Sequence, residues 1–222
     1  MLKSDMHLHA SEDTIHHLSY NAKELIDEAA KFGFEVLSFT FHNKCFFNKE
    51  IFEYAKKKSV LLVSGVEKEI EGKEVLIYNI SKTDIKKLNT FSDLRNLKKN
   101  KGENILIIAP HPYFILPNCL GKKLVKNIDL FDAIEYSHFY LSFLNRNKKA
   151  VRVAKKFNKA IIGTSDAHNF NQLNHTYSLI NSKQDVKSVF EAIRKKNVVL
   201  KTKPLSFSQF VIKTFKVLFK LE

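Results

Sequence analysis

The sequence contains few cysteines and no long apolar run. Cys45 and Cys119 are the only two thiols among 222 residues, too few for a disulfide framework and without the paired spacing of a thiolate metal site. We therefore expect both thiols to be free. No stretch approaches the roughly 20 consecutive apolar residues that cross a bilayer. Because Met1–Asp5 leads into a polar motif and not into an apolar signal core, we expect a soluble, cytoplasmic protein without a transmembrane segment.

Arginine is also scarce, although the chain is basic. The 37 lysines and arginines exceed the 23 acidic residues by 14, and arginine stands only at positions 95, 146, 152 and 194. The lysines are dispersed through segments rich in Asn, Ile and Phe. A positive field favours any small phosphorylated substrate, and it equally permits nucleic acid or an anionic membrane as a partner. The charge alone therefore does not choose among these partners.

Short apolar runs alternate with helical patterns, which is typical of an α/β protein built on a mostly parallel sheet or barrel. The expected strands are 3–8, 35–41, 59–66, 104–109, 131–137, 159–165 and 197–201. The expected helices are 22–32, 48–57, 83–99, 142–157 and 183–196, and Gly72 predicts a hairpin turn within 69–74. The length suits one compact domain, which we place at residues 1–203, followed by a helical segment at 204–222.

The segment 204–222 has the pattern of an amphipathic helix. Its lysines at 213, 216 and 220 share one helical face, and the apolar residues lie largely opposite: Phe207, Phe210, Val211, Leu218 and Leu221. Two interpretations follow. The segment is a final helix docked on or extending the barrel, or its basic and Phe-rich character lets it contact a membrane surface or a partner peripherally.

Polar side chains stand at the ends of the expected strands. His7 and His9 are two residues apart on the first strand, so both imidazoles project from one face and can bind one metal ion. Similar residues follow the other apolar runs: His42, Glu67, His111, His138, Asp166 and His168. In a barrel of parallel strands these ends meet at one mouth. Imidazole and carboxylate ligands without thiolate suit zinc, manganese or iron, so the pattern predicts a metal centre.

Five motifs in this order resemble those of the PHP (polymerase and histidinol phosphatase) family. They are Asp5-x-His7-x-His9, Phe39-Thr40-Phe41-His42-Asn43, Gly65-Val66-Glu67, Pro110-His111-Pro112 and Ser165-Asp166-Ala167-His168, and the similarity spans residues 1 to about 178. The resemblance implies a distorted (β/α)7 TIM-like barrel. It also implies two or three divalent metal ions at the carboxyl ends of the strands and, usually, hydrolysis of a phosphoester.

The resemblance further implies a role for each matching residue. A first ion would be held by His7, His9, Glu67 and Asp166. Glu67 would bridge to a second ion held by His111. A third ion would be held by His42, His168 and a loop histidine whose spacing points to His16 rather than His17. Asp5 would orient a ligand histidine without binding metal itself.

The chain departs from the family pattern at two places. Phe41 stands where many members carry Asp, and Glu74–Tyr78 lacks the histidine that often follows the hairpin after the bridging glutamate. The second ion is therefore the part of the prediction that the family motifs support least. His138, where many members have Asn, is a candidate for the lost ligand, and His175 is expected to contact substrate or to lie at the surface.

The expected chemistry is hydrolysis of a phosphate monoester of a small metabolite or nucleotide by a metal-activated water. Glu67 and Asp166 are the candidate catalytic residues, and Asp166 is the first candidate to transfer a proton. Three alternatives stay open: an exonuclease on RNA or DNA ends, a barrel amidohydrolase, which also opens with His-x-His, and a degenerate metal-binding barrel without catalysis.

Overall fold

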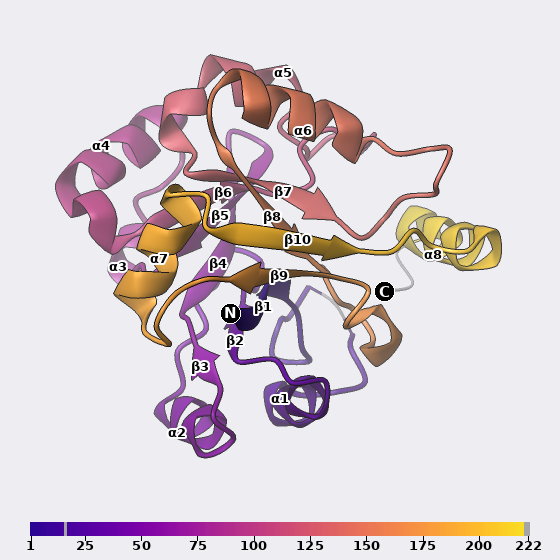
Figure 1. Ribbon diagram of the computed structural model, residues 1–222. Coiled ribbons are helices and arrows are strands. Elements are labelled where there is room, and N and C mark those ends of the chain that lie inside the picture. The colour runs from indigo at the N-terminus through magenta and orange to yellow at the C-terminus, as the bar shows by residue number, and fades with distance from the viewer. Residues whose placement is uncertain (16, 220–222) are drawn as a thin grey trace.

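Strands and helices alternate along most of the chain (Figure 1). The computed structural model describes residues 1–15 and 17–219. The strands are β1 Leu2–Leu8, β2 Val36–Phe39, β3 Leu61–Leu62, β4 Gly65–Ile70, β5 Lys73–Tyr78, β6 Leu106–Ala109, β7 Ala133–Ser137, β8 Ala160–Thr164, β9 Thr176–Ile180 and β10 Val198–Thr202. The α-helices are α1 Ala22–Lys31, α2 Lys49–Lys57, α3 Lys82–Ile85, α4 Phe91–Lys101, α5 Lys122–Lys126, α6 Asn147–Lys156, α7 Val186–Arg194 and α8 Phe207–Phe219.

The strands form two five-stranded sheets, in the orders β10-β9-β1-β2-β3 and β4-β5-β6-β7-β8. Strands β1 to β3 are parallel in the first sheet, and β6 to β8 are parallel in the second. Antiparallel pairing occurs in the β4–β5 hairpin, between β5 and β6, and where β9 joins β1 and β10. The expected α/β class is thus confirmed, with two mixed sheets.

Pairing among the described strands does not close the expected seven-stranded barrel. Single parallel bridges, Leu8 to Ala167 and His42 to Glu67, connect the two sheets at their two seams. At the seam between β1 and β8, strand β9 pairs antiparallel with residues 2–4 of β1 and so occupies the edge that β8 would need. No strand was expected at 176–180. The parallel bridges nevertheless bring the carboxyl ends of β1, β2 and β8 to one end of the molecule.

Local signals in the sequence explain several element boundaries. Helix α1 begins with a capping box, in which the Asn21 side chain accepts from the Glu24 N–H at 3.0 Å and the Glu24 carboxylate accepts from the Asn21 N–H at 2.8 Å. The β4–β5 hairpin turns at Glu71 and Gly72, both with positive φ, as expected from the glycine. The helix expected at 83–99 is divided into α3 and α4, because Thr90 caps a new helix with Asp93.

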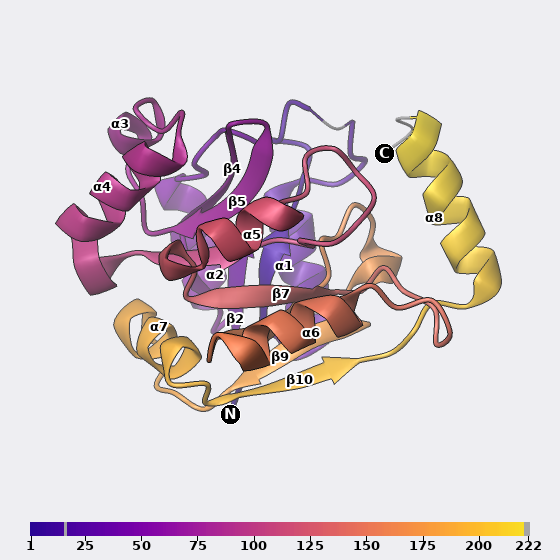
Figure 2. The ribbon, with the colours of Figure 1, turned by 90° about the horizontal axis from the view of Figure 1, so that it is seen from above.

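Apolar side chains fill the space between the sheets and beneath the helices. One buried cluster draws Met6 and Val36 from the first sheet and Leu76, Tyr78 and Ile108 from the second. Two other clusters lie under the helices, one beneath α1 and α2 and one beneath α4 to α6. Figure 2 shows these helices on the outside of the strands. Both cysteines are buried and free, as expected.

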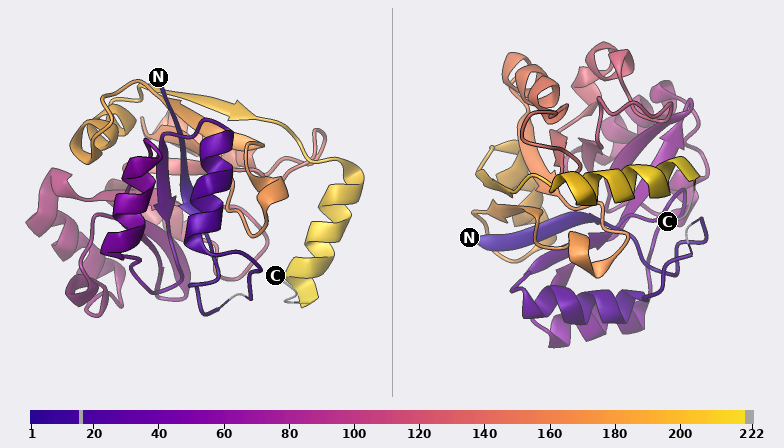
Figure 3. Two further views of the ribbon diagram at one scale, coloured as in Figure 1. Left: turned by 90° about the horizontal axis from the view of Figure 1, so that it is seen from below. Right: turned by 90° about the vertical axis from the view of Figure 1, so that its right-hand side faces the viewer.

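Helix α8 stands apart from the other helices, at the end of the molecule towards which β7 and β10 point (Figures 1 and 3). The Leu205 N–H donates to the Tyr140 carbonyl at 2.9 Å. The Phe210 ring stacks on Phe139, with centroids 4.6 Å apart and an interplanar angle of 8°. The helix is therefore joined to the loop that follows β7. No helix in the described part of the chain combines the length and apolarity needed to cross a membrane.

Candidate metal centre

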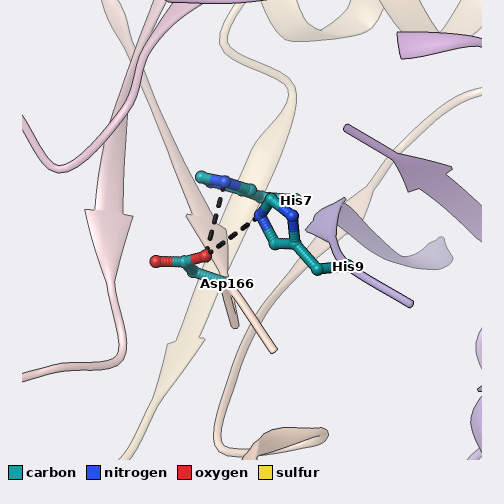
Figure 4. Close-up of side chains that lie close together, drawn as sticks. All are labelled: His7, His9 and Asp166. Carbon is teal, nitrogen blue, oxygen red and sulfur yellow. Dashed lines mark ion pairs between the residues drawn. The ribbon is translucent and has the colours of Figure 1, made fainter. Parts of the chain in front are cut away.

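The two histidines at the end of β1 face one carboxylate. His7 and His9 are fully buried, and the Nε2 atom of each lies 3.4 Å from Oδ1 of Asp166 (Figure 4). Oε2 of Glu67 lies 3.2 Å from the Nε2 of His7 and 3.5 Å from that of His9. These four atoms come from β1, β4 and the loop after β8, which the sheet seams bring together.

The spacing of these four atoms fits a metal ion. Zinc ligands lie at about 2.1 Å, so neighbouring ligand atoms of a tetrahedral site are about 3.4 Å apart. The observed separations of 3.2 to 3.5 Å match that edge. A direct N–H···O hydrogen bond would be nearer to about 2.9 Å. The donor set also fits, because imidazole and carboxylate groups without thiolate suit zinc, manganese or iron.

Glu67 also faces a second group of ligand atoms. Its Oε1 lies 3.3 Å from Nε2 of His111, and that nitrogen lies 3.8 Å from Oε2 of Glu74. Nδ2 of Asn118 donates to the other Glu74 oxygen at 2.6 Å and holds the carboxylate in place. The two oxygens of Glu67 therefore point to two different sets of ligands, as a bridging carboxylate does.

The backbone is strained at two of these residues. Asp166 has φ +47° and His111 has φ +23°, in a region that side chains other than glycine rarely adopt. Each stands two residues after the end of a parallel strand, β8 and β6 respectively. Strain of this kind costs about 1–3 kcal/mol per residue and concentrates at functional sites. Here the Asp166 side chain faces His7 and His9, and the His111 side chain faces Glu67.

Two buried carboxylates that sequence analysis missed hold the histidines in place. Oδ2 of Asp13 lies 2.9 Å from Nδ1 of His9 and 2.8 Å from Nδ1 of His42. The Nε2 of His42 is thereby directed to Glu67 Oε2, at 3.3 Å. Because a carboxylate on the far nitrogen fixes the ring and strengthens it as a metal ligand, Asp13 supports two candidate ligands at once. No motif marks Asp13, which stands in the loop after β1.

Glu135 plays the same part for His7. Its Oε2 lies 3.3 Å from Nδ1 of His7 and accepts the His111 backbone N–H at 3.0 Å, while its Oε1 accepts the Thr164 hydroxyl at 2.6 Å. Asp5, which we expected to orient a histidine ring, instead accepts the backbone N–H groups of Ser165 and His7. Asp5 therefore fixes the backbone at the seam. Burial raises its pKa to about 7.

The remaining candidate ligands lie at the margin of the centre. Four sets of three described residues each bring their ligand atoms within 4.8 Å of one another: His7, His9 and Asp166; His7, His111 and Glu135; His9, Asp13 and His42; and His42, Glu67 and Glu74. None of these sets includes His138 or His168. The His168 ring stacks on His9 at 4.6 Å, so it adjoins the third set. His17 is exposed, and His16 lies outside the described residues.

His138 has a different partner from the one that we expected. Its Nε2 lies 2.8 Å from Nζ of Lys213 in α8, and both side chains are buried. Burial, reinforced by the Lys213 cation, holds the pKa of His138 well below its usual range. Burial, followed by the nearby Lys203, lowers the pKa of His175. The carboxylate of Glu74 lies beside His111, which the sequence analysis assigned to the second ion.

A family model matches part of this chain. A family model described as PHP-associated matches residues 145–198, which include α6, β8, the Asp166-x-His168 motif and β9. No curated protein matches this chain. Several solved structures share the fold. A two-domain protein from Bacteroides vulgatus, described as containing a predicted PHP-like metal-dependent phosphoesterase, is 18% identical with a TM-score of 0.69, over 97% of this chain and 69% of that chain.

These matches support the PHP domain family. PsfC from Pseudomonas syringae is 14% identical with a TM-score of 0.67, over 99% of this chain and 98% of that chain. The lesion-specific endonuclease PfuEndoQ from Pyrococcus furiosus is 16% identical with a TM-score of 0.59, over 90% of this chain and 57% of that chain. This chain therefore spans little more than half of the endonuclease. At such identities the structural likeness shows a shared fold.

At both departures from the PHP pattern, a carboxylate from another position in the sequence lies beside the histidine concerned. Phe41 replaces an acidic residue of many PHP members, and Asp13 provides a carboxylate to His42 from another loop. Leu76 stands near the usual histidine and pairs with Glu67 across the hairpin. Glu74, on the same face of β5 two residues earlier, brings its carboxylate towards His111.

Protonation of the histidines is coupled to metal binding. Burial by itself lowers the pKa of His7, but the carboxylates of Asp166, Glu67 and Glu135 hold it well above its usual range. Burial likewise opposes the charge on His42, and hydrogen bonding to Asp13 with the charge of Glu67 raises its pKa to about 9. Metal ions bind deprotonated imidazole, so these protons must leave when an ion enters.

We therefore expect affinity for Mn²⁺ to increase as the pH rises from about 7 to about 9, with protons released on binding. The stability of the metal-free protein should change in the opposite direction and fall as the pH rises. Since the pKa of His42 in the folded protein lies above its ordinary value of 6.5, its stabilising charge is fully present below 6.5 and is lost as the pH rises through about 9. Titration calorimetry in buffers of different ionisation enthalpy measures both affinity and proton release. An affinity independent of pH over this range would contradict the prediction.

Proposed function

We propose that this protein is a metal-dependent phosphoesterase that hydrolyses the phosphate monoester of a small metabolite or nucleotide. Two or three divalent ions of zinc, manganese or iron would be held by the centre around Glu67. The observation that carries the proposal is that the Nε2 atoms of His7 and His9 each lie 3.2 to 3.5 Å from carboxylate oxygens of Glu67 and Asp166, the separation expected between ligands of one ion. Glu67 faces a second set through its other oxygen.

Each residue of the centre has a distinct part in this proposal. Bound ions lower the pKa of a coordinated water to about 7 and neutralise charge on the phosphoryl oxygens. Glu67 is 2% exposed and ties the two ligand sets together, whereas Asp166 is 21% exposed. Asp166 is therefore the more solvent-accessible of these two carboxylates, which supports it as the group that would pass a proton to the departing oxygen. Asp13 and Glu135 keep the imidazoles aimed at the centre.

The proposal is tested by measuring metal content and phosphate release together. Purified protein loaded with Mn²⁺, Zn²⁺ or Fe²⁺ is expected to release inorganic phosphate from a panel of phosphate monoesters, and a chelator is expected to stop the reaction. Protein that retains no transition metal after loading would contradict the metal centre. Protein that retains metal but hydrolyses none of the esters would reject the monoesterase.

A nuclease is the second candidate, because one protein of this fold is a lesion-specific endonuclease and the chain carries a net charge of +14. The two candidates differ in their products. A monoesterase releases inorganic phosphate from nucleotides, whereas an exonuclease releases mononucleotides from RNA or DNA ends. Incubation of the same metal-loaded protein with a nucleotide panel and with labelled oligonucleotides separates them.

A further inference from the structure

Exposed apolar side chains gather at the end of the molecule that carries the metal centre. Phe47 follows β2, Ile115 follows β6, Phe143 follows β7, and α8 follows β10. Ile115 and Phe143 are 78% and 77% exposed. We call six exposed residues at this end the mouth rim: Phe47, Ile115, Phe143, Phe207, Val211 and Ile212. Since these strands run parallel, the loops after them share the end at which His42, His111 and Asp166 lie.

Helix α8 presents its apolar side to solvent. Phe207, Val211 and Ile212 are exposed, whereas Lys213 is only 9% exposed and lies against His138. A surface helix of a water-soluble domain usually does the reverse, burying its apolar face and leaving lysine in water. The outer face of α8 thus has the composition of a surface that packs against something apolar. Figure 3 shows this helix at the edge of the molecule, away from the helices that cover the sheets.

The composition of the rim favours lipid over nucleic acid. Proteins that grip single strands stack bases on aromatic rings and use arginine on the backbone. The rim is partly aliphatic, with Ile115, Val211 and Ile212, which do not stack on bases. Two of the four arginines are engaged elsewhere, since Arg95 pairs with Asp129 and Arg194 with Asp132. An excess of lysine gives the chain a net charge of +14, which complements an anionic lipid surface.

We propose that the mouth rim docks on an anionic membrane surface and that the metal centre hydrolyses the phosphate monoester of an amphiphile held in that membrane. The substrate class rests on the proposed phosphoesterase function, whereas the docking does not. In the reaction, water adds to phosphorus and the ester P–O bond breaks. The lipid alcohol leaves with a proton and inorganic phosphate is released. The acyl chains stay in the bilayer while the headgroup reaches the centre between the rim loops.

Vesicle binding tests the docking step. The wild-type chain is expected to co-sediment with vesicles of equal parts phosphatidylglycerol and phosphatidylcholine, less with phosphatidylcholine alone, and less at high salt. A Phe143→Ser/Phe207→Ser variant is expected to lose at least about tenfold in affinity, because burial of each phenylalanine is worth about that much. Phe32→Ser, a change of the same type at an exposed position at the end of α1, serves as the matched control.

Because the chain contains no tryptophan, the emission of an introduced indole gives a second readout, which does not depend on loss of binding. A Phe143→Trp variant has a single indole, and its emission is expected to shift to shorter wavelength when anionic vesicles are added. Phe32→Trp is expected to show no shift. The docking would be overturned if the wild-type protein bound neither kind of vesicle, or if the indole emission shifted equally at both positions. It would also be overturned by rim changes that abolish self-association or oligonucleotide binding and leave vesicle binding intact.

Hydrolysis measurements separate this inference from the proposed function. The rim double variant is expected to keep wild-type activity on a soluble phosphate monoester and to lose about tenfold or more on phosphatidate in the same vesicles. Glu67→Ala is expected to lose both activities and still bind vesicles. If the wild type hydrolyses soluble esters but not phosphatidate on vesicles that it binds, the substrate class is wrong and the phosphoesterase survives.

Discussion

Replacing Glu67 by alanine is expected to remove bound metal and to reduce hydrolysis of a phosphate monoester by more than about 100-fold, since even residues that only contact metal ligands cost 10–100-fold. Among the described residues, Glu67 is the carboxylate whose two oxygens lie 3.2 to 3.5 Å from the Nε2 atoms of His7, His9, His42 and His111. Its removal would take from these four imidazoles the carboxylate that they share. Metal analysis and steady-state kinetics measure the two effects.

The matched control for this change is Glu69→Ala, because Glu69 stands two residues along the same strand and its side chain is exposed. We expect that variant to keep metal and activity close to the wild type. Circular dichroism identifies any loss of fold in either variant. A folded Glu67→Ala protein with undiminished chelator-sensitive hydrolysis would contradict the assignment of the centre.

Replacing Glu74 by alanine is expected to remove one ion per chain and to reduce hydrolysis by about 10–100-fold, while the ion at His7 and His9 stays bound. The reason is position, since Oε2 of Glu74 lies 3.8 Å from the His111 nitrogen that faces Glu67. Burial, reinforced by the negative charge of the neighbouring Glu67, raises the pKa of the Glu74 carboxyl to about 7. Metal-to-protein ratios before and after the change give the number of ions lost.

Two further substitutions at this position sharpen the test. Glu74→His restores a nitrogen ligand of the kind common in the family and is expected to retain the second ion. Glu74→Gln keeps the size and the contact with Asn118 but removes the charge, and it is expected to behave like alanine. If all three variants hold as much metal as the wild type, Glu74 is not a ligand.

The motifs were sufficient to bring the candidate ligands to one end of the molecule, because they depend on short-range order. His7 and His9 alternate on one strand, and Asp166 follows β8 directly, so strand geometry alone directs these side chains to one end of the molecule. The hairpin at Gly72 and the cap at Asn21 were predictable for the same reason. Each depends on residues within a few positions of one another.

The supporting carboxylates were not predictable because their contacts cross between elements. Asp13 reaches His42 from a loop 29 residues away, and Glu135 reaches His7 across 128 residues. Glu74 reaches the centre through the register of a hairpin in which Glu67 lies opposite Leu76. Neither the path of a loop nor a cross-strand register leaves a pattern in one sequence that specifies the contact.

By itself, the sequence determined the α/β class and the strand ends that carry imidazole and carboxylate groups, since alternation, caps and turn residues act locally. Tertiary structure alone decided which carboxylates support those groups. It placed β9 on the edge of β1, which leaves the pairing open between the two sheets. It also turned the apolar face of α8 outwards and Lys213 inwards. These outcomes depend on which distant surfaces pack together, because burial is a property of the whole fold and not of a segment.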